Sequence, residues 1–230
     1  MMQTSERWIG VAAGAGLRQA GYQRIIDASW RAIESRGEFV IVLSGGNTPR
    51  GIYTMLRDAS TDWSKWRVYF GDERCLPPED VERNSRMAGD AWLDHMPIPR
   101  DRVHAIPAER GAAEGALAYA RALRGVGDFD LVLLGLGEDG HTASLFPGHD
   151  WGIGAAPDTL AVLDAPKPPP ARVSVSAARL SRAREILFLV EGESKRAAVS
   201  AWRAGSSIPA RAIQPPAGVD VVVESTLINA

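Results

Sequence analysis

A histidine within a glycine-rich turn is the strongest candidate for acid–base chemistry in this sequence. His141 ends the segment Gly135-Leu136-Gly137-Glu138-Asp139-Gly140-His141, directly after the apolar run from Leu131 to Leu134. Histidine is the side chain whose ordinary pKa best suits a general base near neutral pH. Asp139 is close enough in the sequence to orient the imidazole. We therefore expect His141 and Asp139 to be catalytic, and we expect structural roles for the other histidines, His95, His104 and His149.

A second glycine-rich segment has the character of a phosphate-binding turn. Ser44-Gly45-Gly46-Asn47-Thr48-Pro49 follows the apolar run Phe39 to Leu43, and Pro49 suits the first turn of a helix. Such a turn directs free N–H groups and the positive end of a helix dipole at one point. The segment lacks the lysine of a Walker loop and the spacing of GxGxxG. Taken alone, a tight structural turn with Asn47 or Thr48 as helix cap is an equally good interpretation.

Several cations could supply further charge for an anion. Asp72-Glu73-Arg74 follows the apolar run Val68 to Phe70, and Arg74 could bind a phosphate or pair with a carboxylate. For this triplet in isolation, a solvated loop with a salt bridge is the favoured interpretation. The neighbouring Cys75 is expected to be a structural thiol, since no activating base is recognisable. The other candidate cations are Lys167, Arg172, Lys195 and Arg196.

The elements that position these residues alternate between short apolar runs and helical patterns, which predicts an α/β protein. Helices are expected from the spacing of Tyr22, Ile26, Trp30 and Ile33, ending near Gly37, and at residues 112–123 and 194–204. Strands are expected at residues 39–43, 68–70, 131–134, 172–175, 186–190 and 219–223. We expect residues 1–230 to form a single domain with an open, mostly parallel, Rossmann-like sheet, helices on both faces and room for a small added subdomain. In such sheets ligands bind beyond the carboxyl ends of the strands, where the three polar segments lie.

Composition excludes several classes of protein. The 230 residues include 26 Lys and Arg against 28 Asp and Glu, a net charge of −2, and 45% are hydrophobic. This balance argues against disorder and against a nucleic-acid-binding protein. The single cysteine permits no intramolecular disulfide and favours a reducing compartment.

Localisation and partners follow from the same counts. No apolar run approaches the ~20 residues that span a membrane. The one candidate signal-peptide core, residues 8–17, contains three glycines and follows Glu6. His141 and His149 do not have a zinc-binding spacing. We expect a cytoplasmic monomer or weak homodimer that acts on a small molecule, with no metal, cofactor, nucleic acid or membrane partner.

Five ordered segments of the chain resemble the 6-phosphogluconolactonase family, whose superfamily also contains glucosamine-6-phosphate deaminase and ribose-5-phosphate isomerase. The segments are SGGNTP (44–49), GDERCLPPEDVERNSRMA (71–88), GLGEDGHTASLFPG (135–148), KPPPARVSVS (167–176) and GESK (192–195). Several motifs in family order are more specific than any one of them.

The residues also distinguish the lactonase from the deaminase. The deaminase carries Asn-Glu-Pro after its histidine, whereas Phe146 stands in this sequence where that glutamate would be. Arg74 and Pro77 fit the lactonase pattern, in which deaminases typically have tyrosine in place of the arginine. One departure is Arg83-Asn84, where lactonases often have Ser-Asn.

The resemblance implies hydrolysis of 6-phospho-D-glucono-1,5-lactone to 6-phospho-D-gluconate in the oxidative pentose phosphate pathway, without a cofactor. It implies that His141 activates water and that Asp139 orients it. The implied substrate-binding residues are Gly45, Gly46, Asn47, Thr48, Asp72, Arg74, Arg172 and Lys195. A serine nucleophile is disfavoured, because neither Ser44 nor Ser144 lies in a GxSxG elbow. Two alternatives remain open, a deaminase or sugar-phosphate isomerase and a non-catalytic sugar-phosphate sensor.

Overall fold

The computed structural model describes residues 5–228, and its main element is a seven-stranded sheet in which every pairing is parallel. The strand order is β1-β10-β9-β6-β2-β3-β5. The strands are β1 (Glu6–Val11), β2 (Phe39–Leu43), β3 (Trp66–Phe70), β5 (Val103–His104), β6 (Phe129–Gly135), β9 (Ala183–Val190) and β10 (Val219–Glu224). The expected parallel α/β sheet is therefore confirmed, and the three strands that precede the polar segments, β6, β2 and β3, are neighbours.

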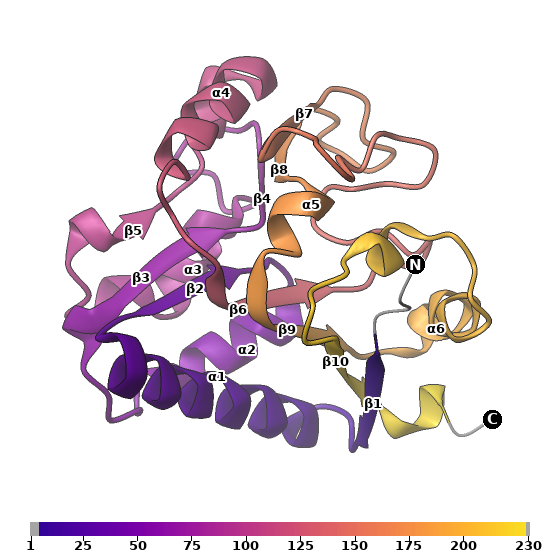
Figure 1. Cartoon of the computed structure of the whole chain (residues 1–230), viewed down its shortest axis with the longest axis horizontal. Helices are drawn as coiled ribbons and strands as arrows, with labels where there is room; N and C mark the ends of the chain where they lie inside the picture. The colour runs from indigo at the N-terminus through magenta and orange to yellow at the C-terminus, as the bar shows by residue number, and fades with distance from the viewer. Residues whose placement is uncertain (1–4, 229–230) are drawn as a thin grey trace.

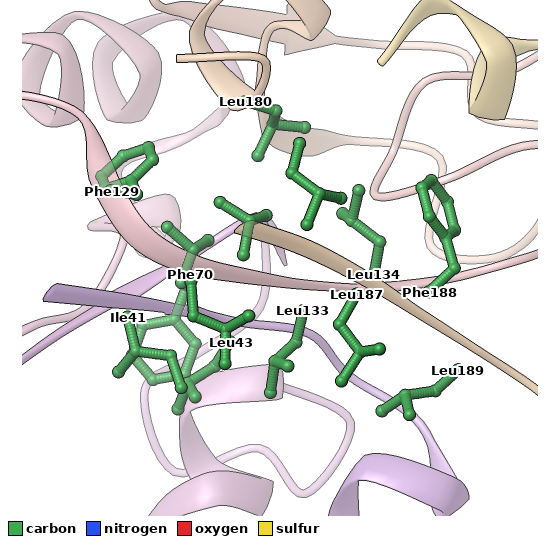
Figure 2. Close-up of a cluster of buried hydrophobic side chains, with 14 of the residues drawn as sticks. Ile41, Leu43, Phe70, Phe129, Leu133, Leu134, Leu180, Leu187, Phe188 and Leu189 are labelled. Atoms are coloured by element: carbon green, nitrogen blue, oxygen red, sulfur yellow. The ribbon is translucent and has the colours of Figure 1, made fainter. Parts of the chain in front are cut away.

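Helices cover both faces of this sheet (Figure 1). They are α1 (Ala15–Arg36), α2 (Asn47–Leu56), α3 (Asn84–Ala91), α4 (Ala112–Ala122), α5 (Ala177–Leu180) and α6 (Arg196–Arg203). Neighbouring residues of β9 show the two faces. Leu189 reaches Gly21 of α1, while Phe188 packs on Trp202 of α6 with ring centroids 4.7 Å apart. Figure 2 shows the same alternation, with Leu189 on one side of the strands and Phe188 on the other.

A second, three-stranded antiparallel sheet stands above the main sheet in Figure 1, in the order β4-β8-β7. Its strands are β4 (Asp72–Arg74), β7 (Thr159–Val162) and β8 (Arg172–Val175). Gly71 joins the two sheets, since its N–H donates to Leu43 O at 2.9 Å and its carbonyl accepts from Val175 N at 2.8 Å. The small sheet is the added unit that the sequence left room for, and the predicted strand at 172–175 belongs to it.

Two expectations need correction. Asp72-Glu73-Arg74 is not a solvated loop, because β4 pairs with β8 and the side chains of Asp72 and Glu73 are buried. The predicted face of α1 is also displaced, since Trp30 is 62% exposed. The buried stripe of α1 contains Leu17, Gly21, Ile25, Ala28 and Ala32 at helical spacing, of which Gly21, Ala28 and Ala32 are small. Small side chains allow the helix to lie close to the sheet, which the apolar spacing of larger residues did not indicate.

The remaining elements follow the sequence closely. Gly37 ends α1 with a left-handed φ of 80°, and its N–H donates to Ile33 O. The candidate signal segment forms β1, which pairs with β10, and the start of α1. The predicted helix at 194–204 is a 3₁₀ turn (Glu193–Lys195) followed by α6. Within residues 5–228, no helix has the length and apolar character to cross a membrane.

Candidate active site

A cavity of about 480 Å³ lies beyond the carboxyl ends of β2, β3, β6 and β9, next to the small sheet. Its size is in the range of about 300–1,000 Å³ that is typical of small-molecule sites. The lining residues come from segments far apart in the sequence: Ser44 to Pro49, Asp72, Arg74, Asn84, Gly135 to Gly137, His141 to Ala143, Lys167, Pro168, Arg172, Leu189, Glu191 and Lys195.

The structure brings nearly all of the predicted site residues to this cavity. The predicted residues that line it are Gly45, Gly46, Asn47, Thr48, Asp72, Arg74, His141, Arg172 and Lys195. Asp139 is not in the lining but contacts His141 from behind. Of the two further candidate cations, Lys167 lines the cavity, whereas Arg196 is paired with Glu193 on the surface.

His141 has the geometry of a positioned base. Its Nδ1 lies 2.5 Å from Asp139 Oδ1, and its backbone N–H donates to the same oxygen at 3.2 Å. A carboxylate only accepts hydrogen bonds, so the ring proton belongs on Nδ1. Nε2 is then the basic nitrogen of the neutral ring. The turn that holds the ring is closed by hydrogen bonds from Gly137 N to His141 O at 2.8 Å and from Gly140 N to Gly137 O at 3.0 Å.

The surroundings keep this imidazole neutral. Burial lowers the pKa of His141, and the positive charge of Lys167 adds to that effect, while the hydrogen bond to Asp139 opposes it. Burial alone would raise the pKa of Asp139, but the hydrogen bonds from His141 outweigh it and the pKa falls below its ordinary value. At neutral pH the pair is therefore a carboxylate and a neutral imidazole.

The start of α2 forms the opposite part of the lining. Gly46, at φ 109°, is the residue before the helix, and the N–H groups of Asn47 and Thr48 have no acceptor within the helix because they belong to its first turn. Gly45 permits a close approach, since a Cβ at this position would overlap the side-chain oxygen of Asn84. These glycines leave backbone donors and the positive helix end facing the cavity, where an anion would be stabilised.

The hydroxyl of Thr48 is already committed to a partner that the sequence reasoning missed. Thr48 Oγ1 donates to Glu191 Oε2 at 2.9 Å, and the N–H of Gly14 donates to the other oxygen. Thr48 is thus available to a phosphate through its backbone rather than its hydroxyl. Glu191 follows the end of β9, so the rule that locates sites beyond strand ends could have found it.

Asp72, on β4, links the start of α3 to the loop that follows β6. Its Oδ1 accepts from Asn84 Nδ2 at 3.0 Å, and its Oδ2 accepts from Ser144 Oγ at 2.6 Å. Among the described residues no hydrogen bond joins Arg74 to Asp72, and each carboxylate oxygen of Asp72 has a partner within the chain. Asn84, which the sequence reasoning did not include among the site residues, contacts both Asp72 and the loop at Gly45. Its place in the motif was the only available signal, because nothing in the local pattern indicates that an asparagine begins a helix against a buried aspartate.

Arg172 and Arg74 both line the cavity, but they differ in the number of hydrogen bonds that their guanidinium groups make to the chain. Arg172 is 6% exposed and donates to the carbonyls of residues 167–169, so it orders the proline-rich loop beside the cavity. Its guanidinium also lies 5.6 Å from the ring centroid of Phe146. Arg74 donates through Nη1 to the carbonyl of Glu82.

Lys195 projects a charge into the cavity from the turn before α6. Burial lowers its pKa, while the nearby carboxylates Glu138 and Asp139 oppose the shift. The positive charge of Lys167, which lines the same cavity, lowers the pKa of Lys195 in the same direction as burial. The cavity thus presents two lysines and two arginines against the lining carboxylates Asp72 and Glu191.

Comparisons with known proteins agree with this arrangement. Residues 13–222 match the model of the family described as glucosamine-6-phosphate isomerases/6-phosphogluconolactonase. The chain is 38% identical over 220 residues to 6-phosphogluconolactonase from Streptomyces coelicolor, which covers 87% of this chain and 82% of the relative. It is 37% identical over 208 residues to the 6-phosphogluconolactonase of Mycobacterium tuberculosis, with 83% and 84% covered.

The solved structures give the same result. The structure of 6-phosphogluconolactonase from Trypanosoma brucei superimposes with a TM-score of 0.87 at 25% identity, covering 97% of this chain and 98% of that one. The matched region includes all the loops that line the cavity. This chain therefore belongs to the glucosamine-6-phosphate isomerase and 6-phosphogluconolactonase family.

Proposed function

We propose that this protein hydrolyses 6-phospho-D-glucono-1,5-lactone to 6-phospho-D-gluconate, in the oxidative pentose phosphate pathway. The observation that carries the proposal is the His141–Asp139 pair at 2.5 Å in a cavity whose other side is the start of α2. Relatives named 6-phosphogluconolactonase over most of the chain support the choice of substrate. No cofactor is required for this hydrolysis.

In the proposed reaction His141 Nε2 removes a proton from water as the water oxygen attacks the lactone carbonyl carbon. The tetrahedral intermediate collapses by breaking the bond from that carbon to the ring oxygen. The proton on Nε2 then passes to the ring oxygen, which becomes a hydroxyl group, and the carbonyl carbon becomes a carboxylic acid that ionises. Asp139 stabilises the transient imidazolium and keeps the ring in the productive tautomer.

The phosphate end of the substrate is proposed to lie at the start of α2. Backbone N–H groups of Asn47 and Thr48 and the charge of Lys195 would bind the phosphate oxygens, and Arg74 would add charge from β4. Asp72 is proposed to hold Asn84 and Ser144 and also to accept hydrogen bonds from sugar hydroxyls, because each carboxylate oxygen can accept more than one hydrogen bond and Asp72 lines the cavity.

A coupled assay on freshly generated lactone tests the proposal. The spontaneous hydrolysis rate is measured in parallel and subtracted. We expect turnover by the wild-type protein and a loss of at least about 100-fold in kcat for His141→Asn, with binding of phosphogluconate retained. Turnover at the spontaneous rate with wild-type protein would contradict the function, whereas full activity of His141→Asn would contradict only the role of the base.

The deaminase or isomerase alternative is disfavoured by Phe146. This side chain is fully buried at the position where the deaminase has its glutamate, and its ring contacts His141. Incubation with glucosamine 6-phosphate or ribose 5-phosphate, followed by an assay for ammonia or isomerised product, separates the alternatives. A non-catalytic sensor would bind these sugars without turning over any of them.

We propose further that the protein acts in the cytoplasm, as one domain and as a monomer or weak homodimer. The single cysteine supports a reducing compartment. Light scattering over a range of protein concentrations measures the oligomeric state.

A further inference from the structure

The imidazole of His141 occupies space that residue 137 leaves free. Gly137 belongs to the segment that follows β6, and a Cβ added to its backbone would overlap three atoms of the His141 ring, with Nδ1 the nearest. Its φ is not in the left-handed region, so the backbone itself would accept an alanine. The reason for glycine at this position is therefore the ring of the base and not the turn.

A second contact comes from Phe146. Its ring centroid lies 4.7 Å from that of His141, with the planes inclined at 41°. Phe146 is itself held, because its side chain packs with Val162 and Ala165 in a small cluster apart from the main core. Its carbonyl also accepts a hydrogen bond from Trp151 Nε1 at 2.6 Å.

We propose that Gly137 and Phe146 are positioning residues for the reaction: the first leaves the space that the imidazole fills, and the second fixes the ring from its apolar side, so that Nε2 meets the water at the carbonyl. The inference rests on the proposed function. The ring is tethered through its Cβ, and the hydrogen bond to Asp139 holds Nδ1. Contacts with Gly137 and Phe146 restrict the remaining change in the tilt of the ring plane.

The charged groups around the ring are few. Asp139 contacts Nδ1, Lys167 lines the same cavity from the proline-rich loop, and Asp72 is the first residue of β4. Phe146 adds no charge and withdraws the ring from water, which makes it part of the burial that lowers the pKa of His141. A smaller apolar side chain at position 146 would therefore admit water and move this pKa upward.

The first test compares Gly137→Ala with a matched glycine of the same region. Gly127 lies two residues before β6, is exposed, has no positive φ, and has open space where the Cβ of an alanine would lie. We expect kcat/KM of Gly137→Ala to fall by about 100-fold, the cost of a displaced catalytic group. Gly127→Ala is expected to keep wild-type kinetics. Binding of inorganic phosphate, at the start of α2, is expected to be unchanged in both and verifies folding.

The second test uses the ring itself. In NMR spectra of the wild-type protein, the proton on His141 Nδ1, which is hydrogen-bonded to Asp139, is expected far downfield. Gly137→Ala should remove this resonance. Phe146→Leu is expected to shift the titration of His141, and with it the acid limb of kcat/KM, to higher pH. Loss of stability alone would lower the yield of folded protein without moving either midpoint.

The outcomes separate the two proposals. If wild-type protein fails to hydrolyse the lactone, the proposed function is wrong, while the NMR titrations still test the positioning of His141. If the lactone is hydrolysed and Gly137→Ala retains wild-type kcat/KM and the downfield resonance, the inference for Gly137 is overturned. An unmoved titration in Phe146→Leu overturns the inference for Phe146.

Discussion

Two histidines of this chain have aspartate partners, in different surroundings. His141 is 18% exposed and paired with Asp139 at the cavity, whereas His149 pairs with Asp164, which is 79% exposed and 3.2 Å away. Only the first pair has its far nitrogen at a site where a reacting molecule could bind. The imidazole of His141 is the more buried group of its pair, since Asp139 is 37% exposed, and burial of the ring strengthens its hydrogen bond to the carboxylate.

This difference predicts the pH dependence of the enzyme. In the proposed mechanism His141 acts as a base in its neutral form, so kcat/KM is expected to be at its plateau above the pKa of His141 and to be lost as the pH falls through it. Burial lowers this pKa, and the midpoint of the acid limb should therefore lie below the ordinary value of about 6.5. Asp139→Asn removes a group that raises the pKa, so the midpoint should move lower still while the plateau falls by about 100-fold or more.

Asp164→Asn is the matched control for this experiment, since it removes the aspartate of the other pair. It should leave the pH profile and the plateau unchanged. A profile with its acid limb above pH 6.5, or one that Asp139→Asn does not move, would contradict the assignment of His141 as the base.

Lys195 and Arg196 are adjacent cations, and replacing each in turn tests whether Lys195 contacts the phosphate of the substrate. Lys195 lines the cavity, while Arg196 is directed to Glu193 at 2.8 Å on the surface. Lys195→Gln should raise KM by about tenfold or more with a small effect on kcat, because a contact to the distant phosphate is present in both ground and transition states. Arg196→Gln should behave as wild type. If the two substitutions raised KM equally, the cause would be the overall positive charge of the region, and the proposed contact between Lys195 and the phosphate would be contradicted.

At the level of elements, the N-terminus of α3 is held by a buried carboxylate. Glu73 is fully buried on β4, and it accepts from the backbone N–H groups of Asn84 and Ser85, each at 2.8 Å. The guanidinium of Arg83 lies 3.5 Å from the same carboxylate. This contact places Asn84 beside Asp72 and Gly45, so the position of α3 determines the shape of the cavity.

Removal of this carboxylate should weaken both fold and site. Glu73→Ala is expected to lower the free energy of unfolding by about 3 kcal/mol, because Arg83 and the first N–H groups of α3 lose their buried partner. Urea denaturation measures the change. Glu79→Ala, an exposed glutamate of the same connection, should change the free energy by less than about 0.5 kcal/mol. Equal stability of the two variants would show that the cap is not required.

The whole molecule brings the site together at the junction of two sheets. Gly71 bonds to β2 of the main sheet and accepts from β8 of the small one, and residues of both sheets line the cavity. A ligand that bridges them stabilises the folded state in proportion to its affinity. Binding is therefore expected to be visible as thermal stabilisation of the entire chain.

At 100 times its Kd, 6-phosphogluconate should add about 2.7 kcal/mol to the stability. For a chain of this size that corresponds to a rise in Tm of about 5–10 °C, measured by differential scanning calorimetry. Gluconate, which lacks the phosphate, should produce a much smaller rise at the same concentration, and so should 6-phosphogluconate with Lys195→Gln. Identical shifts for gluconate and phosphogluconate would contradict a phosphate subsite at α2.

Local sequence patterns were sufficient for the parallel sheet and for the side of it that carries the site. Continuous apolar runs such as Phe39 to Leu43 and Ile186 to Val190 predict strands buried on both faces, and polar residues beyond their ends predict the ligand edge. His141 was recognisable for the same reason. The buried face of α1 could not be recognised from the sequence, because the helix packs on the sheet through small residues such as Gly21 and Ala28, while Trp30 is exposed.

What the sequence alone determined about this protein is therefore the order of its elements and the edge of the sheet at which the candidate site, with His141, lies. Only the tertiary structure decided that Asp72 binds Asn84 and Ser144, that Thr48 is held by Glu191, and that the His141 ring lies over Gly137. Secondary-structure propensity and the spacing of apolar residues depend on residues that are close together in the sequence. Pairs such as Ser144 with Asp72 are 72 residues apart, and their contact depends on how two sheets meet, which no local pattern records.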